Sequence, residues 1–288
     1  MTTLVQAWTQ ARDRLKAARV DSPVIDARML VEAAAGASRT DIVTDPYREL
    51  PAEALATLDD YLERRSRREP VSRILGRRGF WKIMLQLTPD VLSPRPDTET
   101  VVQEALRGFD EHRRFNVLDL GVGSGAIILA ILAERPLARG LGTDVSPEAL
   151  AGARDNAARL GLADRLALMH GDWTEGMADA SFDLVVSNPP YIPDADVEGL
   201  DPEVRDHDPH LALKGGADGL DHYRRLAPEV LRVLRPGGRF LLEIGHDQSA
   251  AVEALMRGAG AVQVATVKDL ADRDRVVAGA RNSLETAT

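Results

Sequence analysis

The chain has 288 residues and no cysteine, which predicts two domains, one small and one of ordinary size, and excludes disulfides, thiol nucleophiles and thiolate metal sites. The net charge is −9, and the acidic excess lies beyond residue 80, so the larger part lacks the basic stripe that duplex nucleic acid requires. No segment approaches the roughly 18 apolar residues of a membrane span and no signal-peptide core is present, so we expect a cytoplasmic protein without a membrane partner.

Residues 1–75 show helical spacing of apolar side chains throughout. Ser22 before Pro23 is a typical helix start, and Gly36 is a typical stop. Further helices are expected at residues 40–43 and 51–68. We predict a small helical bundle without a catalytic constellation. It is either a substrate-recognition module or a cap that stabilises the fold.

The densest basic run lies at the end of this bundle and comprises Arg64, Arg65, Arg67, Arg68, Arg73, Arg77 and Arg78. Two interpretations stay open. The cations either complement the dipole at the C-terminal end of a solvated helix, or they form a contact surface for an anionic partner.

In residues 76–98 the helical spacing of apolar side chains gives way to a different pattern. A partial alternation predicts a β-hairpin that links the two domains, and it is carried by Phe80, Ile83, Leu85 and Leu87. Asp97 or Thr98 can cap the helix that follows. Arg95 is either a surface charge or a cation that faces a ligand, and its spacing favours the surface.

The second domain begins with a strand, a glycine-rich turn and a helix in the sequence NVLDLGVGSGAIILAIL. Gly121, Gly123 and Gly125 let the backbone turn tightly and let a ligand approach main-chain N–H groups. This motif alone is a weak signal, because dinucleotide-binding enzymes use a close relative of it. Here the later glycine of those enzymes is missing, and an acid, Asp119, stands two positions before Gly121.

The next two strands also end in polar or aromatic residues. A strand at residues 140–143 ends at Asp144, which can bind both hydroxyls of a ribose or can cap the following helix. A third strand at residues 166–169 precedes Asp172 and Trp173. These two side chains can meet an adenine ring by hydrogen bonding or stacking, or can belong to an ordinary turn.

The stretch FDLVVSNPPY, residues 182–191, combines a buried strand with an abrupt polar end. The two prolines have no N–H to give to a ladder, so the chain leaves the sheet there. The Asn188 oxygen and a proline carbonyl can accept hydrogen bonds from a substrate –NH2, while Tyr191 lies against its planar face. Because no strong base is present, the motif favours transfer to an amide or exocyclic amine by positioning and electrostatics.

An acidic, irregular stretch follows at residues 192–223, long enough to predict a functional loop. The sequence HDPH beginning at His207 holds possible metal ligands, but their spacing fits no compact site and we expect no metal. A flexible flap over the site is indicated by Gly215, Gly216 and Gly219. Beyond it we expect a helix at residues 220–234, a turn at 236–238, a strand at 239–245, a helix at 249–257 and strands at 262–267 and 275–278.

The motifs LDLGVGSGAI, GTDVS, GDW and SNPPYI, in this order, resemble those of class I S-adenosylmethionine-dependent methyltransferases. Four further segments, EPVSRILGRRGFW, TPDVLSPRPDTE, ALKGGADGL and KDLADRDRVV, narrow the resemblance. The whole chain resembles the PrmC/HemK family, whose members methylate the glutamine amide in the Gly-Gly-Gln motif of peptide chain release factors. The resemblance implies an α/β, Rossmann-like, mostly parallel seven-stranded sheet, with a helical domain at residues 1–75, a linking hairpin at 76–98 and a methyltransferase domain at 99–288.

The resemblance also implies roles for single residues. S-adenosylmethionine, with S-adenosylhomocysteine as product, would be held by Gly121, Val122, Gly123, Ser124, Gly125, Asp144, Trp173 and Asn188. The catalytic and substrate-binding residues would be Asn188, Pro189, Pro190 and Tyr191. Release factors are the implied protein substrate, and we expect a monomer with no metal and no stable nucleic-acid partner.

Three positions depart from the family pattern. Val122 stands where threonine is common, and Asp208 replaces the usual glutamate before Pro209, which leaves the hydrogen bonding of the flap open. Arg73 stands where many members have tyrosine, which can alter how the helical domain meets its partner.

The predicted mechanism is in-line transfer of a methyl group from the sulfonium to the glutamine amide nitrogen, helped by two acceptors and a closed apolar site. Two alternatives share the chemistry. One is a glutamine methyltransferase acting on a ribosomal protein; the other is an adenine-specific nucleic-acid methyltransferase, which the acidic second domain disfavours. A nicotinamide oxidoreductase would need the missing glycine, and the intact glycine-rich turn disfavours a non-enzymatic binder of release factors.

Overall fold

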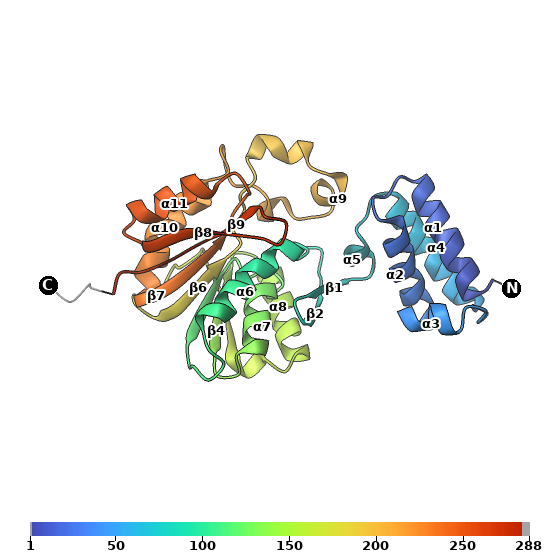
Figure 1. Ribbon diagram of the computed structural model, residues 1–288, viewed down its shortest axis with the longest axis horizontal. Helices are drawn as coiled ribbons and strands as arrows, with labels where there is room; N and C mark the ends of the chain where they lie inside the picture. Colours follow the sequence, from blue (N-terminus) through green and yellow to red (C-terminus); the bar gives the residue numbers. More distant parts are fainter. Residues whose placement is uncertain (1, 284–288) are drawn as a thin grey trace. The chain divides into compact units, whose positions relative to one another are not determined.

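The computed structural model describes residues 2–283 (Figure 1). The chain forms two compact units. The first comprises Met1–Arg77 and Asp201–His207, and the second Arg78–Leu200 and Asp208–Thr288, as far as the structure describes these ranges. A short piece of the loop after the NPPY sequence therefore belongs to the helical unit.

The helical unit contains α1 (Leu4–Ala17), α2 (Pro23–Ala35), α3 (Arg39–Thr44), α4 (Ala52–Ser66), α5 (Val71–Ile74) and α9 (Pro202–Arg205). Its helix ends follow local chemistry. Pro23 stands in the first turn of α2, and Gly36 ends the helix with a left-handed φ of 57°. Ser38 and Asp41 form a reciprocal capping box on α3.

A buried arginine ties this unit together. Arg65 lies on α4, and only 4% of its side chain is exposed. Its Nε donates to Asp26 Oδ2 of α2 at 2.7 Å, and its Nη2 donates to Glu203 Oε1 of α9 at 2.8 Å. The apolar core around it comes from α1, α2 and α4 and includes Leu4, Leu15, Leu30, Leu58 and Leu62. The ion cluster thus holds the returning segment Asp201–His207 against the helices.

The predicted hairpin is confirmed as a two-stranded sheet of β1 (Arg77–Phe80) and β2 (Ile83–Gln86). Phe80, Ile83 and Leu85 are buried, as the alternation predicted.

The second unit is built on a seven-stranded sheet with the order β5-β4-β3-β6-β7-β9-β8. The strands are β3 (Asn116–Leu120), β4 (Arg139–Asp144), β5 (Leu166–His170), β6 (Phe182–Ser187), β7 (Leu234–Glu243), β8 (Val262–Lys268) and β9 (Asp274–Ala280). Pairing is parallel from β5 to β7, and β9 runs antiparallel to both of its neighbours. The predicted α/β, mostly parallel sheet is confirmed.

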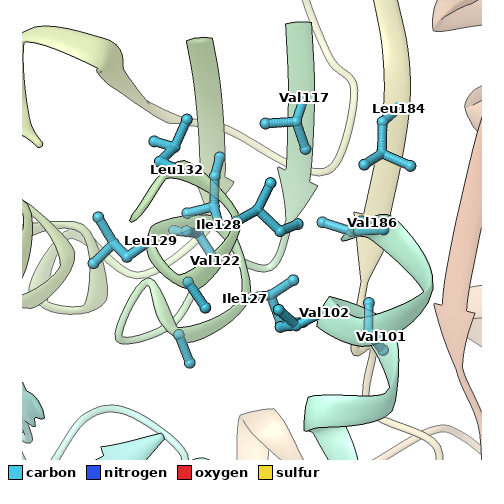
Figure 2. Close-up of a cluster of buried hydrophobic side chains, with 14 of the residues drawn as sticks. Val101, Val102, Val117, Val122, Ile127, Ile128, Leu129, Leu132, Leu184 and Val186 are labelled. Carbon is cyan, nitrogen blue, oxygen red and sulfur yellow. The ribbon is translucent and has the colours of Figure 1, made fainter. Parts of the chain in front are cut away.

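Two apolar layers cover the sheet because neighbouring residues on a strand face opposite ways. On one side lie α6 (Glu99–Gly108), α7 (Ala126–Glu134) and α8 (Pro147–Arg159); on the other lie α10 (Asp221–Val233) and α11 (Ser249–Gly258) (Figure 1). Figure 2 shows the first layer, where Val101 and Val102 of α6 and Ile127 and Ile128 of α7 meet Val117 of β3 and Val186 of β6.

The strand order creates a switch point beside β3. The chain proceeds from β3 to β4 and β5 in one direction and then returns to place β6 on the other side of β3. Ligands of open α/β sheets bind at the carboxyl ends of the strands at such a point. The register pairs Leu120 with both Thr143 and Ser187, so the residues that follow these three strands meet at one edge.

The segment at residues 236–238 was predicted as a turn, but it lies inside β7. The ladder between β6 and β7 skips from Phe182↔Leu234 to Leu184↔Arg239, so the PGG sequence forms a bulge. Gly237 N donates to Arg281 O at 3.0 Å, and Arg281 N donates to Gly238 O at 2.9 Å. The bulge keeps its backbone hydrogen bonds, and the strand therefore continues through it.

No helix among residues 2–283 has the length and apolar character needed to cross a bilayer.

Candidate active site

The glycine-rich turn joins β3 to α7 at the switch point. Gly121, Gly123 and Gly125 have φ values of 72°, 52° and 83°, a region in which side chains are strained. A Cβ on Gly125 would lie 2.7 Å from Leu129 Cδ1, so this glycine also permits close packing within the turn and α7. The turn is tied to β4 because the N–H groups of Gly121 and Val122 both donate to Thr143 O, at 2.9 and 2.8 Å.

Asp144 ends β4 beside this turn and organises it. Its Oδ2 accepts from Gly123 N and its Oδ1 accepts from Ser146 N, both at 2.9 Å. Each oxygen therefore keeps a lone pair for a ligand. The half-buried carboxylate thus accepts hydrogen bonds from the backbone of two loops at once. It can cap the following helix and still bind the hydroxyls of a ribose.

A cavity of about 540 Å³ opens at this edge of the sheet. Most of the predicted site residues line it: Gly121, Val122, Gly123, Ser124, Asp144, Trp173, Asn188 and Pro190. Gly125, Pro189 and Tyr191 are not among the described residues that line it.

Trp173 forms one wall of the cavity. Its ring approaches the Gly121 backbone, because a Cβ built there would lie 3.5 Å from Trp173 Cζ3. The ring also meets His222 edge to face, with centroids 5.4 Å apart. Trp173 O accepts from the Thr143 hydroxyl at 3.0 Å, which fixes the backbone at its positive φ of 54°.

The NPPY sequence leaves β6 at the opposite wall. The Ser187 hydroxyl donates to Leu120 O at 2.7 Å and locks the end of β6 to β3. Asn188 Nδ2 donates to Thr98 Oγ1 at 3.4 Å, which leaves Asn188 Oδ1 for a ligand. Burial raises the pKa of Tyr191 far above its ordinary value, so its phenol stays uncharged. Gln248 Nε2 donates to Tyr191 O at 3.0 Å.

The three glycines predicted to form a flexible flap have another structural reason. A Cβ on Gly219 would lie 2.3 Å from Tyr191 O, and one on Gly215 would lie 2.8 Å from Tyr191 Cα. A Cβ on Gly216 would lie 1.8 Å from Asp221 Oδ2. Close packing against the NPPY backbone therefore accounts for glycine at positions 215 and 219, and a positive φ of 87° favours glycine at position 216.

Arg95 keeps 38% of its side chain exposed, as the surface interpretation predicted, but it is paired with a buried acid. Its Nη2 lies 2.5 Å from Asp208 Oδ2, and Asp208 is buried with 2% of its side chain exposed. Asp208 Oδ1 also accepts from Ser93 N at 3.3 Å. The aspartate that replaces the usual glutamate thus makes two contacts with the segment before α6. The pairing was hidden from the sequence because the two side chains stand far apart along the chain.

Two family models match the chain: PrmC N-terminal domain over residues 6–76 and Methyltransferase domain over residues 111–276. A protein named release factor glutamine methyltransferase from Caulobacter vibrioides is 66% identical over 283 residues, which cover 98% of this chain and 98% of that protein. The chain belongs to the release factor glutamine methyltransferase family. A relative of the same name from Rhodospirillum rubrum is 46% identical, and the match covers 94% of this chain and 82% of that one.

The solved structures agree with the fold of this family. The hMettl16 catalytic domain in complex with MAT2A 3'UTR hairpin 6 has a TM-score of 0.57 at 17% identity, over 82% of this chain and 83% of that one. A methyltransferase from Pyrococcus furiosus has a TM-score of 0.50 at 18% identity, over 69% and 88%. At these identities the likeness shows the fold alone. The resemblance that the motifs indicated is confirmed. The prediction that the chain is an S-adenosylmethionine-dependent methyltransferase is confirmed with it.

The cavity of this methyltransferase also includes residues to which the sequence assigned no binding role. Asp119 is 1% exposed; its Oδ2 accepts from Ile128 N at 3.2 Å, and its Oδ1 has no hydrogen-bond partner among the described residues. Burial raises the pKa of Asp119 well above its ordinary value. Thr98, Ser146, Leu211 and His222 line the cavity as well. The sequence could have indicated Asp119, because it stands beside the glycine-rich turn. No local pattern indicates that the other four residues lie at the cavity.

The HDPH sequence and the many acidic side chains are possible metal ligands. Within residues 2–283, no three or more His, Asp or Glu side chains gather in an arrangement that could hold a metal ion.

Proposed function

We propose that this methyltransferase modifies the side-chain amide nitrogen of the glutamine in the Gly-Gly-Gln motif of peptide chain release factors, with S-adenosylmethionine as methyl donor. The assignment of the substrate rests on the match, over 98% of both chains, to a Caulobacter vibrioides protein named for this activity. Asn188 and Pro190, which line the same cavity as the glycine-rich turn, support the assignment.

The residues around the cavity fit S-adenosylmethionine. The unpartnered Asp119 Oδ1 suits a cationic ammonium group, and the spare lone pairs of Asp144 suit two ribose hydroxyls. Trp173 supplies an aromatic face for an adenine ring. We assign Gly121 to Gly125 to the turn that shapes this part of the cavity. When bound, the cofactor supplies a methyl group attached to a positively charged sulfur.

The substrate amide needs help because its nitrogen lone pair is delocalised. In this proposal Asn188 Oδ1 and a proline carbonyl of the NPPY sequence accept its two hydrogens, which orients the nitrogen and favours charge on it. Pro189 and Tyr191 do not line the cavity, and we assign them to the peptide that carries the glutamine. The largely apolar cavity wall excludes water from the reacting atoms.

The direct test is transfer of radiolabelled methyl from S-adenosylmethionine to a purified release factor, with the glutamine of its Gly-Gly-Gln motif replaced by alanine as control. We expect label on the unaltered factor alone. Label on a ribosomal protein or on nucleic acid instead, with no label on the release factor, would overturn the proposed substrate.

Asp144→Asn tests the proposed ribose contact. The variant loses the charge that strengthens hydrogen bonds to two hydroxyls, and a hydrogen bond to a charged group contributes about 1.5–3 kcal/mol. We expect the affinity for S-adenosylmethionine to fall by roughly 10- to 100-fold. Isothermal calorimetry measures it, and Asp155→Asn on the exposed face of α8 is the matched control. Equal affinities for the two variants would remove Asp144 from the binding site.

We further propose that the enzyme acts as a monomer in the cytoplasm, where release factors work, without a stable nucleic-acid partner. Light scattering should give the mass of one chain, 31.3 kDa. A duplex-binding assay should show no complex.

A further inference from the structure

Two segments far apart in the sequence form parts of the cavity wall. The first lies between β2 and α6, and the second follows the segment Asp201–His207 of the helical unit. Both supply apolar side chains to the cavity: Val91, Leu92 and Pro94 from the first, and Pro209, Leu211 and Ala212 from the second. Neither segment is part of the seven-stranded sheet, so strand pairing does not fix where these walls stand.

The side chain of Asp208 joins the two wall segments. This residue stands directly before Pro209, and its side chain is 2% exposed. Its Oδ2 accepts from Arg95 Nη2 at 2.5 Å, and its Oδ1 accepts from Ser93 N at 3.3 Å. Ser93 and Arg95 stand on either side of Pro94, which lines the cavity. One buried carboxylate therefore holds the end of the first wall segment against the start of the second.

Asp208 is also one of two anchors of the second segment. At the other end, Leu213 O accepts from Ile192 N at 3.0 Å, directly after the NPPY sequence. A short 3-10 turn, His210–Ala212, lies between the anchors. Hydrogen bonds between charged groups are about twice as strong as neutral ones, and a buried carboxylate left without its cation is strongly unfavourable. Loss of either charge should therefore free this end of the segment.

We propose that Asp208 is a positioning residue that latches the two wall segments together and thereby retains S-adenosylmethionine in the cavity. While the latch holds, the walls keep the arrangement seen in the structure, and little ordering is required when the cofactor binds. When the latch is broken, the walls separate in a fraction of the molecules, and the affinity falls with the fraction that stays competent. The separated form also gives bound cofactor a route out, so dissociation becomes faster. This inference rests on the proposed place of S-adenosylmethionine in the cavity.

The test is the dissociation rate of S-adenosylhomocysteine, followed by stopped-flow fluorescence of Trp173, which lines the cavity. Asp208→Asn keeps an acceptor for Ser93 N but loses the charge that binds Arg95. We expect the dissociation rate constant to rise about 10-fold, the effect of losing one hydrogen bond between charged groups. Arg95→Met should do the same, and the double variant should be no faster than either single one. Asp208→Glu keeps the charge and should stay close to the wild-type rate.

A matched control breaks a similar pair at the other edge of the sheet. Asp183, near the start of β6, has an Oδ2 that accepts from Asn116 N and from Arg235 Nη1, both at 2.8 Å. None of these three is among the described residues that line the cavity. Asp183→Asn should leave the dissociation rate unchanged. A wild-type rate in either Asp208→Asn or Arg95→Met, or an equal rise in Asp183→Asn, would overturn the proposal.

A second readout needs no cofactor. Hydrogen–deuterium exchange of the free enzyme should become faster in residues 90–94 and 209–212 together in Asp208→Asn, and should not change there in Asp183→Asn. The amide of Ser93 is the direct reporter, because it donates to Asp208. Faster exchange in one wall segment alone, or in neither, would show that Asp208 does not hold the two together.

The outcomes separate this inference from the proposed function. If Trp173→Phe leaves the fluorescence change on binding intact, the cofactor binds elsewhere, and the inference fails together with the proposed site. If the wild-type enzyme labels the release factor and the variants release S-adenosylhomocysteine at the wild-type rate, the inference alone fails. If the release factor stays unlabelled while the dissociation rates change as expected, the proposed substrate fails and the latch stands.

Discussion

Replacing Asn188 by alanine should lower kcat/KM for release-factor methylation by about 100-fold or more. The variant removes the Oδ1 acceptor, and loss of one preorganised polar contact at a reacting centre typically costs 10² to 10³ in rate. The carboxamide is oriented before substrate arrives, because Nδ2 is held by Thr98 and the end of β6 is locked to β3 through Ser187. An alanine cannot recover this geometry. Single-turnover methyl transfer at saturating cofactor measures the effect on the chemical step.

Asn116→Ala provides the control. Asn116 begins β3 at the far end of the same sheet, and the hydrogen bond that Asp183 accepts comes from its backbone N–H, which alanine keeps. Its rate should equal that of the wild-type enzyme. Thermal unfolding of both variants separates loss of chemistry from loss of fold. Near-normal turnover by Asn188→Ala would show that the NPPY carboxamide does not carry the reaction.

The second large effect concerns stability. Arg65→Met should destabilise the helical unit by about 3–5 kcal/mol, because it leaves two carboxylates without their shared cation in a largely buried site. Burial opposes the charge of Arg65, but the hydrogen bonds that its guanidinium donates to Asp26 and Glu203 outweigh this effect and raise the pKa of the guanidinium. Glu203 lies in the segment that returns from the loop after Tyr191. Hydrogen–deuterium exchange of α2, α4 and α9 should report the opening directly.

Arg67→Met is the matched change, since Arg67 ends the same helix with 75% of its side chain exposed. Its effect should stay within about 0.5 kcal/mol. A variant that also replaces Asp26 and Glu203 by leucine and methionine should recover much of the lost stability, because no charge is then left buried. Indistinguishable exchange in Arg65→Met and Arg67→Met would show that the buried ion cluster does not stabilise the unit.

Local sequence patterns correctly predicted those elements whose residue types depend on their own burial and backbone angles. The apolar run before Asn188 and the glycines after Leu120 place two strand ends without any knowledge of the sheet, because burial on both faces and positive φ values leave direct marks on residue type. The capping signals at Ser22 and Gly36 likewise bounded α2 correctly.

The errors share a physical origin. The ion pair of Arg95 with the buried Asp208 was missed because Asp208 stands far along the chain. The PGG sequence was predicted as a turn between a helix and a strand, but it lies inside β7, where its backbone hydrogen-bonds with Arg281. The glycines at 215 and 219 were interpreted only as signs of a flexible flap, and the approach of the Tyr191 backbone, a second reason for glycine, was missed. In each case a contact between distant segments outweighed the local signal.

The sequence by itself determined the fold class, the glycine-rich turn and the NPPY motif, since each depends on neighbouring residues whose types report burial, backbone angle or hydrogen-bonding capacity. Only the tertiary structure decided how these parts meet. It set the register that brings the ends of β3, β4 and β6 together, the pairing of Arg95 with Asp208, and the hydrogen bond from Asn188 to Thr98. Those contacts join residues that no period or motif relates, because their proximity arises from the order of the strands in the sheet.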